Sequence, residues 1–505
     1  MTATVLRLSQ TDDVAIALED VTRGSIAGEV VAVDDVARGH KIALRDLDAG
    51  AQVHKYGHVI GVATSAIRAG EHVHTHNLGM PDAAATLASG DASATRAQLP
   101  SDLRRTFPGF VRRSGKVATR NYIGVLTTVN CSATVARQVA RRTEDQVAAL
   151  HAEGVDGVVA LTHGTGCGMA NRGAGWDILR RTLQGYARHP NIGGLVVIGL
   201  GCEVNAVNGL VEELGPQDDI PVVPYTIQDA GGTMAAIDHG VSLVREMAGD
   251  LRGTARQDVG VEHLVLGLQC GGSDGFSGLT ANPALGVASD LLVAAGATSI
   301  LGETPEVYGA EQMLAARASD PAVGDALLRR IAWWEEYTRS QGTTLDGNPS
   351  PGNKAGGITT ILEKSLGAVA KGGHSPLAAV CEYAEPAPGP GLVFMDTPGY
   401  DPVSVTGMVA GGANVVCFTT GRGSVFGSRP VPTIKLATNS ELARRMSGDI
   451  DLDCSGVIEE EVPLADMGRR VYDLILDVAG GRRSLSEELG LGGEEMVPWQ
   501  IGAVL

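Results

Sequence analysis

The sequence lacks the features that would place the protein in a membrane, on a secretory route or on nucleic acid. No apolar run reaches the roughly 18 residues that a membrane-spanning helix needs, and charged residues follow the N-terminus too soon for a signal peptide. Lys and Arg form no cluster, and 40 basic against 58 acidic residues give a formal net charge of −18, which repels phosphate backbones and anionic membranes. We therefore expect a cytoplasmic protein that binds neither nucleic acid nor membranes.

Cysteine is also scarce. Seven cysteines among 505 residues are too few for a disulfide framework and indicate reduced thiols, and none has the CxxC spacing of a strong metal motif. By contrast, 44% of the residues are hydrophobic, which is enough to bury large cores. Because a single core stops growing near roughly 250 to 300 residues, a chain of this length is expected to form at least two domains.

The chain is predicted to be α/β, with a small N-terminal β domain followed by a two-part α/β body that contains parallel sheets. Residues 12–80 alternate short apolar runs with glycine-bearing turns, as in a compact β domain. Residues 81–108 are rich in Ala, Ser, Thr and Pro and are predicted to be a linker. Residues 109–255 and 256–505 each alternate strand-like runs with helical segments, which indicates βαβ units.

The strand-like runs of the body end in residues rich in Gly, Cys and Asn. In open α/β sheets ligands bind at the carboxyl ends of the strands, so polar residues directly after a run are the first candidates for chemistry. The predicted strands cover residues 122–129, 157–161, 194–200, 263–269, 391–395 and 415–419, and the predicted helices cover residues 133–150, 176–187 and 325–340.

Four cysteines each follow or end an apolar run, a placement that predicts that they gather at one sheet edge. They are Cys131, Cys167, Cys202 and Cys270. Clustered thiolates suit iron, zinc or an iron–sulfur centre, and His163 and Glu203 are close enough in sequence to be further ligands. Cysteine also serves as a small apolar residue at packed strand ends, and this interpretation stays open beside the first.

Three histidines, His72, His74 and His76, alternate along one predicted strand. Alternate residues of an extended strand point to the same face, so the three imidazoles could bind a metal or an anion together. A surface run of histidines without a role is the alternative.

Three loops could hold a small acidic ligand. The glycine-rich run 271–278 contains Ser273 and Asp274 and offers backbone N–H groups to a carboxylate. The run 348–357 contains Asn353 and one cation, Lys354, and Arg422 follows an apolar run where it could grip a carboxylate with two hydrogen bonds. A plain turn, a solvated lysine and a structural salt bridge are the competing interpretations. Together these residues predict a site for a small polyhydroxylated anion, without choosing between hydrolysis, isomerisation and elimination.

Six motifs in this order resemble the altronate/galactarate dehydratase family. They are THGTGCGM (162–169), GLGCE (199–203), QCGGSDGFSGLTANP (269–283), NPSPGNKAGGITT (348–360), EKSLG (363–367) and TTGRG (419–423). The N-terminal motifs GHKIAL (39–44), KYGHVIGVA (55–63) and HVHTHN (72–77) are similar to the β-clip module, called a SAF domain, that is fused to these enzymes.

The resemblance implies a hydro-lyase that converts a hexonate or hexarate to a 2-keto-3-deoxy acid with a divalent metal, Fe²⁺ or Mn²⁺. The HVHTHN segment is typical of the altronate type, which favours D-altronate over galactarate or another aldonate. A related two-subunit sulfolactate sulfo-lyase carries the two modules in separate chains, and their fusion here argues against that activity. The resemblance also implies a sugar acid as the partner molecule, and we expect a homo-oligomer, most simply a dimer.

The resulting hypothesis is removal of the C2 proton and loss of the C3 hydroxyl while a metal and a cation hold the substrate carboxylate. The candidate catalytic residues are His72, His74, His163, Asp274 and Lys354; the candidate substrate contacts are Lys41, Ser273, Asn353 and Arg422; and the candidate metal ligands are Cys131, Cys167, Cys202, Glu203 and Cys270. Two alternatives stay open: an iron–sulfur dehydratase in which three of the four cysteines hold the cluster, and a non-catalytic sugar-acid sensor.

Overall fold

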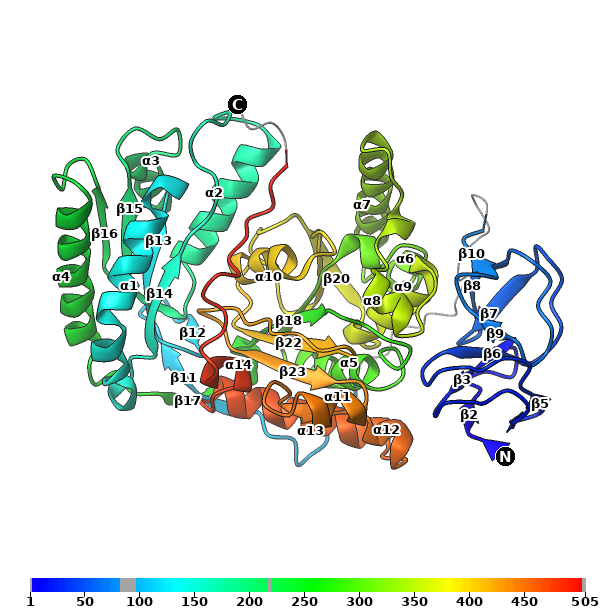
Figure 1. Cartoon of the computed structure of the whole chain (residues 1–505). Coiled ribbons are helices and arrows are strands. Elements are labelled where there is room, and N and C mark those ends of the chain that lie inside the picture. The colour runs from blue at the N-terminus through cyan, green and yellow to red at the C-terminus, as the bar shows by residue number, and fades with distance from the viewer. Residues whose placement is uncertain (1, 82–96, 217–218, 502–505) are drawn as a thin grey trace.

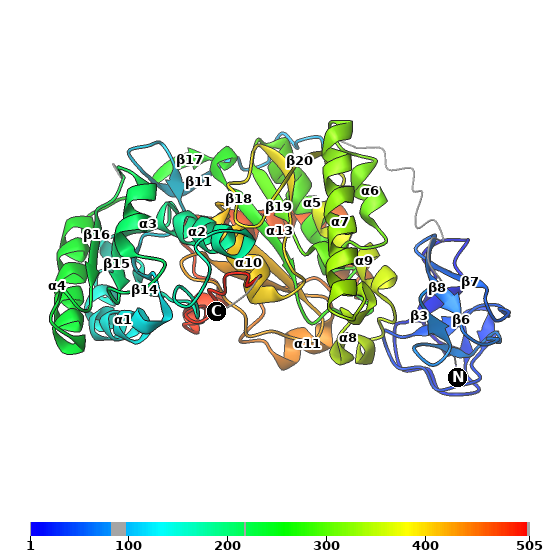
Figure 2. The same ribbon diagram turned by 90° about the horizontal axis from the view of Figure 1, so that it is seen from above.

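The computed structural model describes residues 2–81, 97–216 and 219–501. Figure 1 and Figure 2 show an N-terminal β module at one end, a four-stranded sheet with its helices at the other, and a seven-stranded sheet between them. The predicted α/β class with parallel sheets is confirmed. Most of the predicted linker falls on residues 82–96, outside the described residues. Across the described ranges, no helix is both long enough and apolar enough to cross a membrane.

The N-terminal β module consists of three small sheets, with strand orders β1-β4-β5, β2-β3-β6-β9 and β10-β8-β7. Its strands are β1 (Thr2–Ala3), β2 (Val5–Leu6), β3 (Val14–Ala17), β4 (Ile26–Ala27), β5 (Val30–Val31), β6 (Lys41–Ala43), β7 (Gln52–Lys55), β8 (His58–Ala63), β9 (His72–Val73) and β10 (Leu78–Gly79). The antiparallel pairing of β6 with β9 places Ile42 opposite His72. The start of β6 therefore lies beside the histidine segment.

The predicted strand through His76 is wrong beyond Val73. The His74 N–H donates to Asn77 Oδ1 at 2.9 Å, and Asn77 Nδ2 donates to the His72 carbonyl at 2.9 Å. These hydrogen bonds from a short polar side chain close a turn, which competes with the extended backbone.

The middle sheet is parallel throughout, with strand order β14-β13-β15-β16. Its strands are β13 (Tyr122–Thr127), β14 (Gly157–Leu161), β15 (Ile192–Gly199) and β16 (Val222–Thr226), and its helices are α1 (Ala133–Ala148), α2 (Ala174–Ala187), α3 (Val207–Leu214) and α4 (Thr233–Leu251). Helices α1 and α4 share one apolar core with the sheet, and α2 and α3 share the core on its other face. The three predicted strands and two predicted helices of this region are confirmed to within two residues.

A small antiparallel sheet, β12-β11-β17, combines two strands that precede the middle sheet in the chain with one strand that follows it. Its strands are β11 (Thr106–Val111), β12 (Val117–Ala118) and β17 (Gln257–Gly260). Strand β11 thus begins inside the stretch predicted to be a linker. The reason is its pairing with β17, about 150 residues later in the sequence, which no local composition indicates.

The C-terminal sheet is also parallel, with strand order β20-β21-β19-β18-β22-β23-β24. Its strands are β18 (Val265–Cys270), β19 (Thr298–Leu301), β20 (Leu377–Cys381), β21 (Gly391–Met395), β22 (Val415–Thr420), β23 (Thr433–Ala437) and β24 (Leu452–Asp453). The chain leaves β18 towards β19 but leaves β22 towards β23. The direction therefore reverses between β18 and β22, and such a reversal is where open α/β sheets bind ligands.

The helices of this region are α5 (Ala281–Ala294), α6 (Glu311–Ala315), α7 (Pro321–Ser340), α8 (Pro351–Ala355), α9 (Ile361–Val369), α10 (Asp401–Ala410), α11 (Ser440–Arg445), α12 (Gly456–Glu459), α13 (Leu464–Ala479) and α14 (Leu485–Glu488). Helices α5 and α13 contact one another within the large core on one face of the sheet. Helix α10 contributes to the cores on the opposite face and contacts α2 of the middle region.

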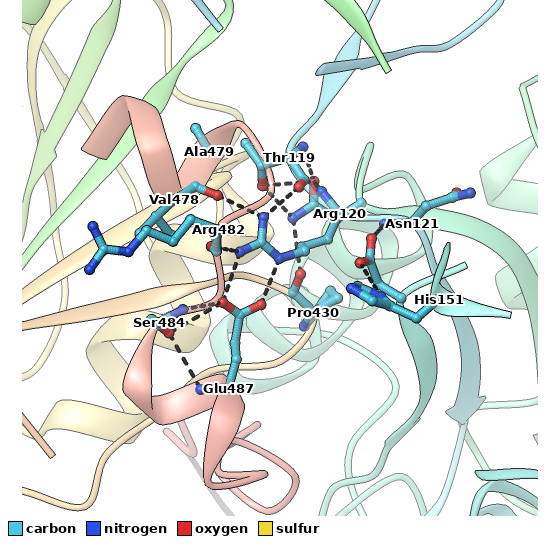
Figure 3. Close-up of polar contacts among 12 residues, drawn as sticks. Thr119, Arg120, Asn121, His151, Pro430, Val478, Ala479, Arg482, Ser484 and Glu487 are labelled. Atoms are coloured by element: carbon cyan, nitrogen blue, oxygen red, sulfur yellow. Dashed lines mark hydrogen bonds and ion pairs between the residues drawn. The ribbon is translucent and has the colours of Figure 1, made fainter. Parts of the chain in front are cut away.

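One buried arginine joins the middle and C-terminal regions. Figure 3 shows Arg120, which is 1% exposed, between the two. Its Nε and Nη2 donate to the two carboxylate oxygens of Glu487 at 2.6 and 2.8 Å. Its remaining donors reach the carbonyls of Thr119, Val478 and Arg482 at 2.7 to 2.9 Å. Every nitrogen of the guanidinium group is therefore hydrogen-bonded.

Candidate active site

A polar cavity of about 110 Å³ lies at the reversal point of the C-terminal sheet. We call it the arginine pocket, because three guanidinium groups line it. Its charged and amide-bearing side chains are Arg38, Asp274, Arg422, Asn439, Glu441 and Arg445. Arg38 comes from the N-terminal β module, so the pocket lies between the module and the sheet. Of the residues predicted from the sequence, Asp274 and Arg422 meet here.

Asp274 is held in the wall of this pocket by several donors. Its Oδ1 accepts from the hydroxyls of Ser277 and Thr438 at 3.0 and 2.9 Å, and its Oδ2 accepts from Asn439 Nδ2 at 2.9 Å. Gly421 packs so closely that a Cβ there would overlap the Asp274 carboxyl group. Burial raises the pKa of Asp274 above its ordinary value, against the lowering effect of these hydrogen bonds.

Three imidazoles of the β module converge beside the arginine pocket. The ring nitrogens of His40, His72 and His74 lie within 4.8 Å of one another, and we call this group the histidine triad. His40 Nδ1 lies 3.0 Å from His72 Nε2, and His40 Nε2 lies 3.3 Å from the carbonyl oxygen of Ala355. Ala355 also lines the arginine pocket. The triad is therefore adjacent to the pocket.

The histidine triad has the chemistry of a metal site. Burial, followed by the charge of Lys41, lowers the pKa of His74 to about 3, and burial together with the neighbouring His40 lowers that of His72 to about 4. Both rings are therefore neutral at physiological pH, with lone pairs free for a divalent transition metal. In addition, His74 Nδ1 is buried and has no hydrogen-bond partner, which is rare unless a ligand occupies the position.

Two buried lysines hold the β module against the C-terminal region. Lys41 Nζ lies 2.8 Å from Glu363 Oε2 and donates to the Gly357 carbonyl at 2.6 Å, and Lys55 Nζ lies 2.7 Å from Glu363 Oε1. Lys41, predicted as a substrate contact, is fully buried and engaged in this group. Its charge acts on the triad instead.

Cys270 ends β18 in a second cluster of titratable side chains. Its Sγ lies 2.9 Å from Lys371 Nζ, 3.5 Å from Glu306 Oε2 and 3.7 Å from Glu303 Oε2. Cys270, Glu303 and Glu306 form the second group of possible metal ligands found among the described residues. However, the Lys371 ammonium group already lies against both the thiol and Glu303, at 2.8 Å from the latter. This group therefore fits a metal less well than the histidine triad does.

The sequence predicted that the four cysteines gather at one sheet edge, but they belong to two different sheets. Cys131, Cys167 and Cys202 follow β13, β14 and β15 of the middle sheet and are exposed, whereas Cys270 belongs to the C-terminal sheet and is buried. The prediction is wrong for Cys270 because apolar runs do not reveal that the strands divide into two sheets. Glu203, the fifth predicted ligand, accepts hydrogen bonds from Thr128 Oγ1 and from two backbone N–H groups.

Other predicted residues have structural partners. His163 is buried, with Nε2 3.1 Å from the Thr127 carbonyl and Nδ1 3.2 Å from Thr165 Oγ1, and burial lowers its pKa to about 4. Asn353 takes part in the capping box of α8 and donates to the Ser273 carbonyl at 2.9 Å. The half-buried Lys354 follows it in α8.

Sequence reasoning missed four residues of the site: His40, Arg38, Asn439 and Arg445. His40 lies 32 positions before His72, and only the pairing of β6 with β9 brings them together. Asn439 and Arg445 follow β23, a strand that was not predicted. A search for polar residues after β23 would have found Asn439.

The chain matches three family models in succession. They are the altronate/galactarate dehydratase SAF domain at residues 3–81, the D-galactarate dehydratase/altronate hydrolase second domain at 109–252, and the D-galactarate/altronate dehydratase C-terminal model at 261–504. The chain is 38% identical to the altronate dehydratase of Escherichia coli (strain K12), over 95% of this chain and 96% of that protein. It is 35% identical to the altronate dehydratase of Bacillus subtilis (strain 168), over 94% and 95%. It is also 36% identical to the galactarate dehydratase (L-threo-forming) of Escherichia coli (strain K12), over 97% and 95%.

Proposed function

The chain belongs to the altronate/galactarate dehydratase family, and from this premise we propose that it dehydrates a sugar acid, with D-altronate favoured, to a 2-keto-3-deoxy acid. Galactarate or another aldonate is the alternative substrate, because relatives named for both acids match this chain to a similar degree. The observation that carries the proposal is the neutral histidine triad, with its unpartnered His74 Nδ1, beside a pocket lined by three arginines.

The arginine pocket suits the carboxylate of the substrate. Arg422 and Arg445 are exposed to solvent, and Arg38 reaches the same cavity from the β module. A guanidinium group can bind a carboxylate with two parallel hydrogen bonds and remains charged at every physiological pH. The same groups would offset the negative charge that develops when the C2 proton leaves and the carboxylate takes its enediolate form.

The histidine triad fits a divalent metal, with Fe²⁺ or Mn²⁺ favoured. His40, His72 and His74 would hold it through ring nitrogens, and when bound it would supply a Lewis acid for a substrate oxygen. In this proposal His72 and His74 act as ligands, whereas the sequence had suggested them as catalytic residues. The buried ammonium group of Lys41 helps to keep the triad unprotonated and so ready for a metal.

Asp274 is the proposed general base. Its carboxylate lines the arginine pocket, its position is fixed by four hydrogen bonds, and burial raises its pKa towards the range in which a base works best. It would take the C2 proton on a carboxylate oxygen. Lys354, half-buried in α8 beside the pocket residue Ala355, stays the prediction for a cation that helps to hold the substrate carboxylate.

The test is an anaerobic assay of the metal-stripped protein after addition of Fe²⁺ or Mn²⁺, with a panel of aldonates and aldarates and detection of 2-keto-3-deoxy product. We expect metal-dependent turnover of one acid, and a loss of about 10²- to 10⁴-fold in kcat for Asp274→Asn. His74→Ala should lose both bound metal and turnover, whereas its matched control His76→Ala, from the same turn but outside the triad, should keep both. Binding of a sugar acid without product formation would support a sensor instead.

A further inference from the structure

The carboxyl edge of the middle sheet presents three free thiols. Cys131 follows β13, Cys167 follows β14 and Cys202 follows β15, and β13 lies between the other two strands in the sheet. These three cysteines are exposed, whereas the chain's other four are buried. We call the three the thiol edge. Exposed free cysteines are prone to oxidation, so three of them on adjacent strand ends call for a ligand rather than a packing role.

Hydrogen bonds tie the three cysteine-bearing loops together. The Asn130 N–H donates to the Thr165 carbonyl at 2.9 Å, which joins the loop after β13 to the loop after β14. The buried Asn205 joins all three, because its N–H donates to the Gly166 carbonyl at 3.0 Å and its side chain donates to the Thr128 carbonyl at 2.7 Å. The backbone that carries the thiols is therefore held in place before any ligand binds.

Close backbone packing reinforces this arrangement. Gly166, directly before Cys167, has a φ of 102°, and a Cβ there would overlap the Thr128 carbonyl. Gly201, directly before Cys202, has a φ of 121°. Each of these two cysteines therefore follows a glycine whose conformation other residues rarely adopt, which lets the loops approach one another.

The three thiols are not placed to share a single metal ion. Thiolates on one ion lie about 2.3 Å from the metal and so within about 4.6 Å of one another. Within residues 2–81, 97–216 and 219–501, the groups of three ligands that meet such a limit are the histidine triad and the Cys270 group, not the thiol edge. An iron–sulfur cluster binds each cysteine at a different iron and therefore accepts thiolates that are farther apart.

We propose that Cys131, Cys167 and Cys202 hold a [4Fe–4S] cluster, with one iron left without a protein thiolate. Thr165, Met169 and Arg172, from the same loop as Cys167, line a cavity of about 240 Å³. Figure 1 and Figure 2 show that the C-terminal sheet lies between the middle sheet and the β module, and the histidine triad belongs to that module. The proposal is thus independent of the proposed metal and substrate site.

The experiment is anaerobic reconstitution of the full-length protein with Fe³⁺, sulfide and a thiol reductant that supplies the two electrons each [4Fe–4S]²⁺ cluster needs, followed by removal of unbound iron. We expect roughly four irons and four acid-labile sulfides per chain, visible absorbance, and an electron paramagnetic resonance signal after reduction. The triple variant Cys131→Ser/Cys167→Ser/Cys202→Ser should lose all sulfide. The double variant His72→Ala/His74→Ala, which removes the other proposed metal site, should keep the sulfide and the signal.

Two results would overturn the proposal: no sulfide in the reconstituted wild-type protein, or the same sulfide content in the triple variant. Circular dichroism and the Tm show whether the triple variant is folded, which we expect because its three side chains are exposed. If it does not fold, the three single Cys→Ser variants replace it, and each should lose most of its sulfide. Cys270→Ser, which alters a buried thiol of the other sheet, should leave the sulfide content unchanged.

Discussion

The C-terminal region contacts its two neighbours through two buried ion groups that differ in charge balance. Toward the β module, Lys41 and Lys55 share one carboxylate, that of Glu363, so the group carries one excess positive charge. Toward the middle region, Arg120 and Glu487 form a one-to-one pair, and backbone carbonyls accept the remaining guanidinium hydrogens. Figure 3 shows the second arrangement, in which no charge is left over.

This difference in charge balance distinguishes a contact that only stabilises the fold from a contact that also affects the candidate active site. The Arg120 guanidinium group donates to backbone carbonyls, and its neighbour Thr119 donates to the Asn414 carbonyl directly before β22. The arginine pocket, by contrast, is lined by residues that follow β18 and β22. The excess charge at the Glu363 group lies next to the histidine triad, where, after burial, Lys41 makes the largest contribution to the low pKa of His74. An ion pair whose charges balance stabilises the fold, whereas an ion group with an excess charge also shifts the pKa of its neighbours.

The largest expected effect comes from Glu363→Ala. This change leaves two buried ammonium groups without a counterion, and removing one partner of a buried ion pair costs about 3 to 5 kcal/mol. We expect the β module to detach from the C-terminal region, because Lys41 and Lys55 are the module's half of this ion group. Turnover should fall by more than about 10²-fold, because Arg38 and the histidine triad leave with the module.

Hydrogen exchange of β6 and of α9 measures this undocking directly. Glu385→Ala is the matched control, because Glu385 belongs to the same region but pairs at the surface with Arg181. Normal turnover and unchanged exchange in Glu363→Ala would show that the module is held by other contacts.

Arg120→Met should lower the stability of the protein without changing its chemistry. The variant leaves Glu487 and three carbonyl groups without their buried donor, so the free energy of unfolding should fall by about 3 to 5 kcal/mol. The double variant Arg120→Met/Glu487→Leu removes both charges and should recover part of this loss. Denaturant unfolding gives the stability, and kcat of the folded variant at low temperature should stay near the wild-type value. A Tm equal to that of the wild type would contradict a structural role.

The parallel strands were the part of the fold that the sequence predicted best. Strands buried on both faces are continuous apolar runs, and β14 and β21 begin and end at the predicted residues. The same reasoning placed Cys131, Cys167 and Cys202 at strand ends. It could not assign Cys270 to another sheet, because strand order depends on contacts between segments that are distant in the chain.

The site was predicted only in part, for the same reason. Asp274 and Arg422 were found because each follows an apolar run of the sheet. His40 was missed because it joins His72 through strand pairing, and Arg38 was missed because docking of the β module brings it to the pocket. The segment alternates like a strand, but hydrogen bonds of the Asn77 side chain close a turn at His74 in place of the extended backbone.

The smallest expected effect on stability concerns a surface ion pair at the edge of the contact between the β module and the C-terminal region. Arg38 Nη2 lies 2.6 Å from Glu459 Oε1, with side-chain exposures of 26% and 35%, and pairs of this kind contribute less than about 1 kcal/mol. Glu459→Gln should therefore leave the module docked, because the buried Glu363 group remains. If this variant exposed β6 to exchange as strongly as Glu363→Ala does, the surface pair rather than the buried group would hold the module.

Arg38 itself should behave differently from its partner. It lines the arginine pocket and packs its guanidinium group 4.8 Å from the centre of the Phe276 ring, so it contributes to substrate binding as well as to the surface ion pair. Arg38→Met should raise KM by roughly tenfold, the loss of about 1.4 kcal/mol in substrate binding, while Glu459→Gln leaves KM unchanged. Steady-state kinetics of the two variants thus distinguish a charge that binds substrate from one that only completes a surface pair. Equal KM values would place the substrate carboxylate beyond the reach of Arg38 and leave Arg422 and Arg445 as its partners.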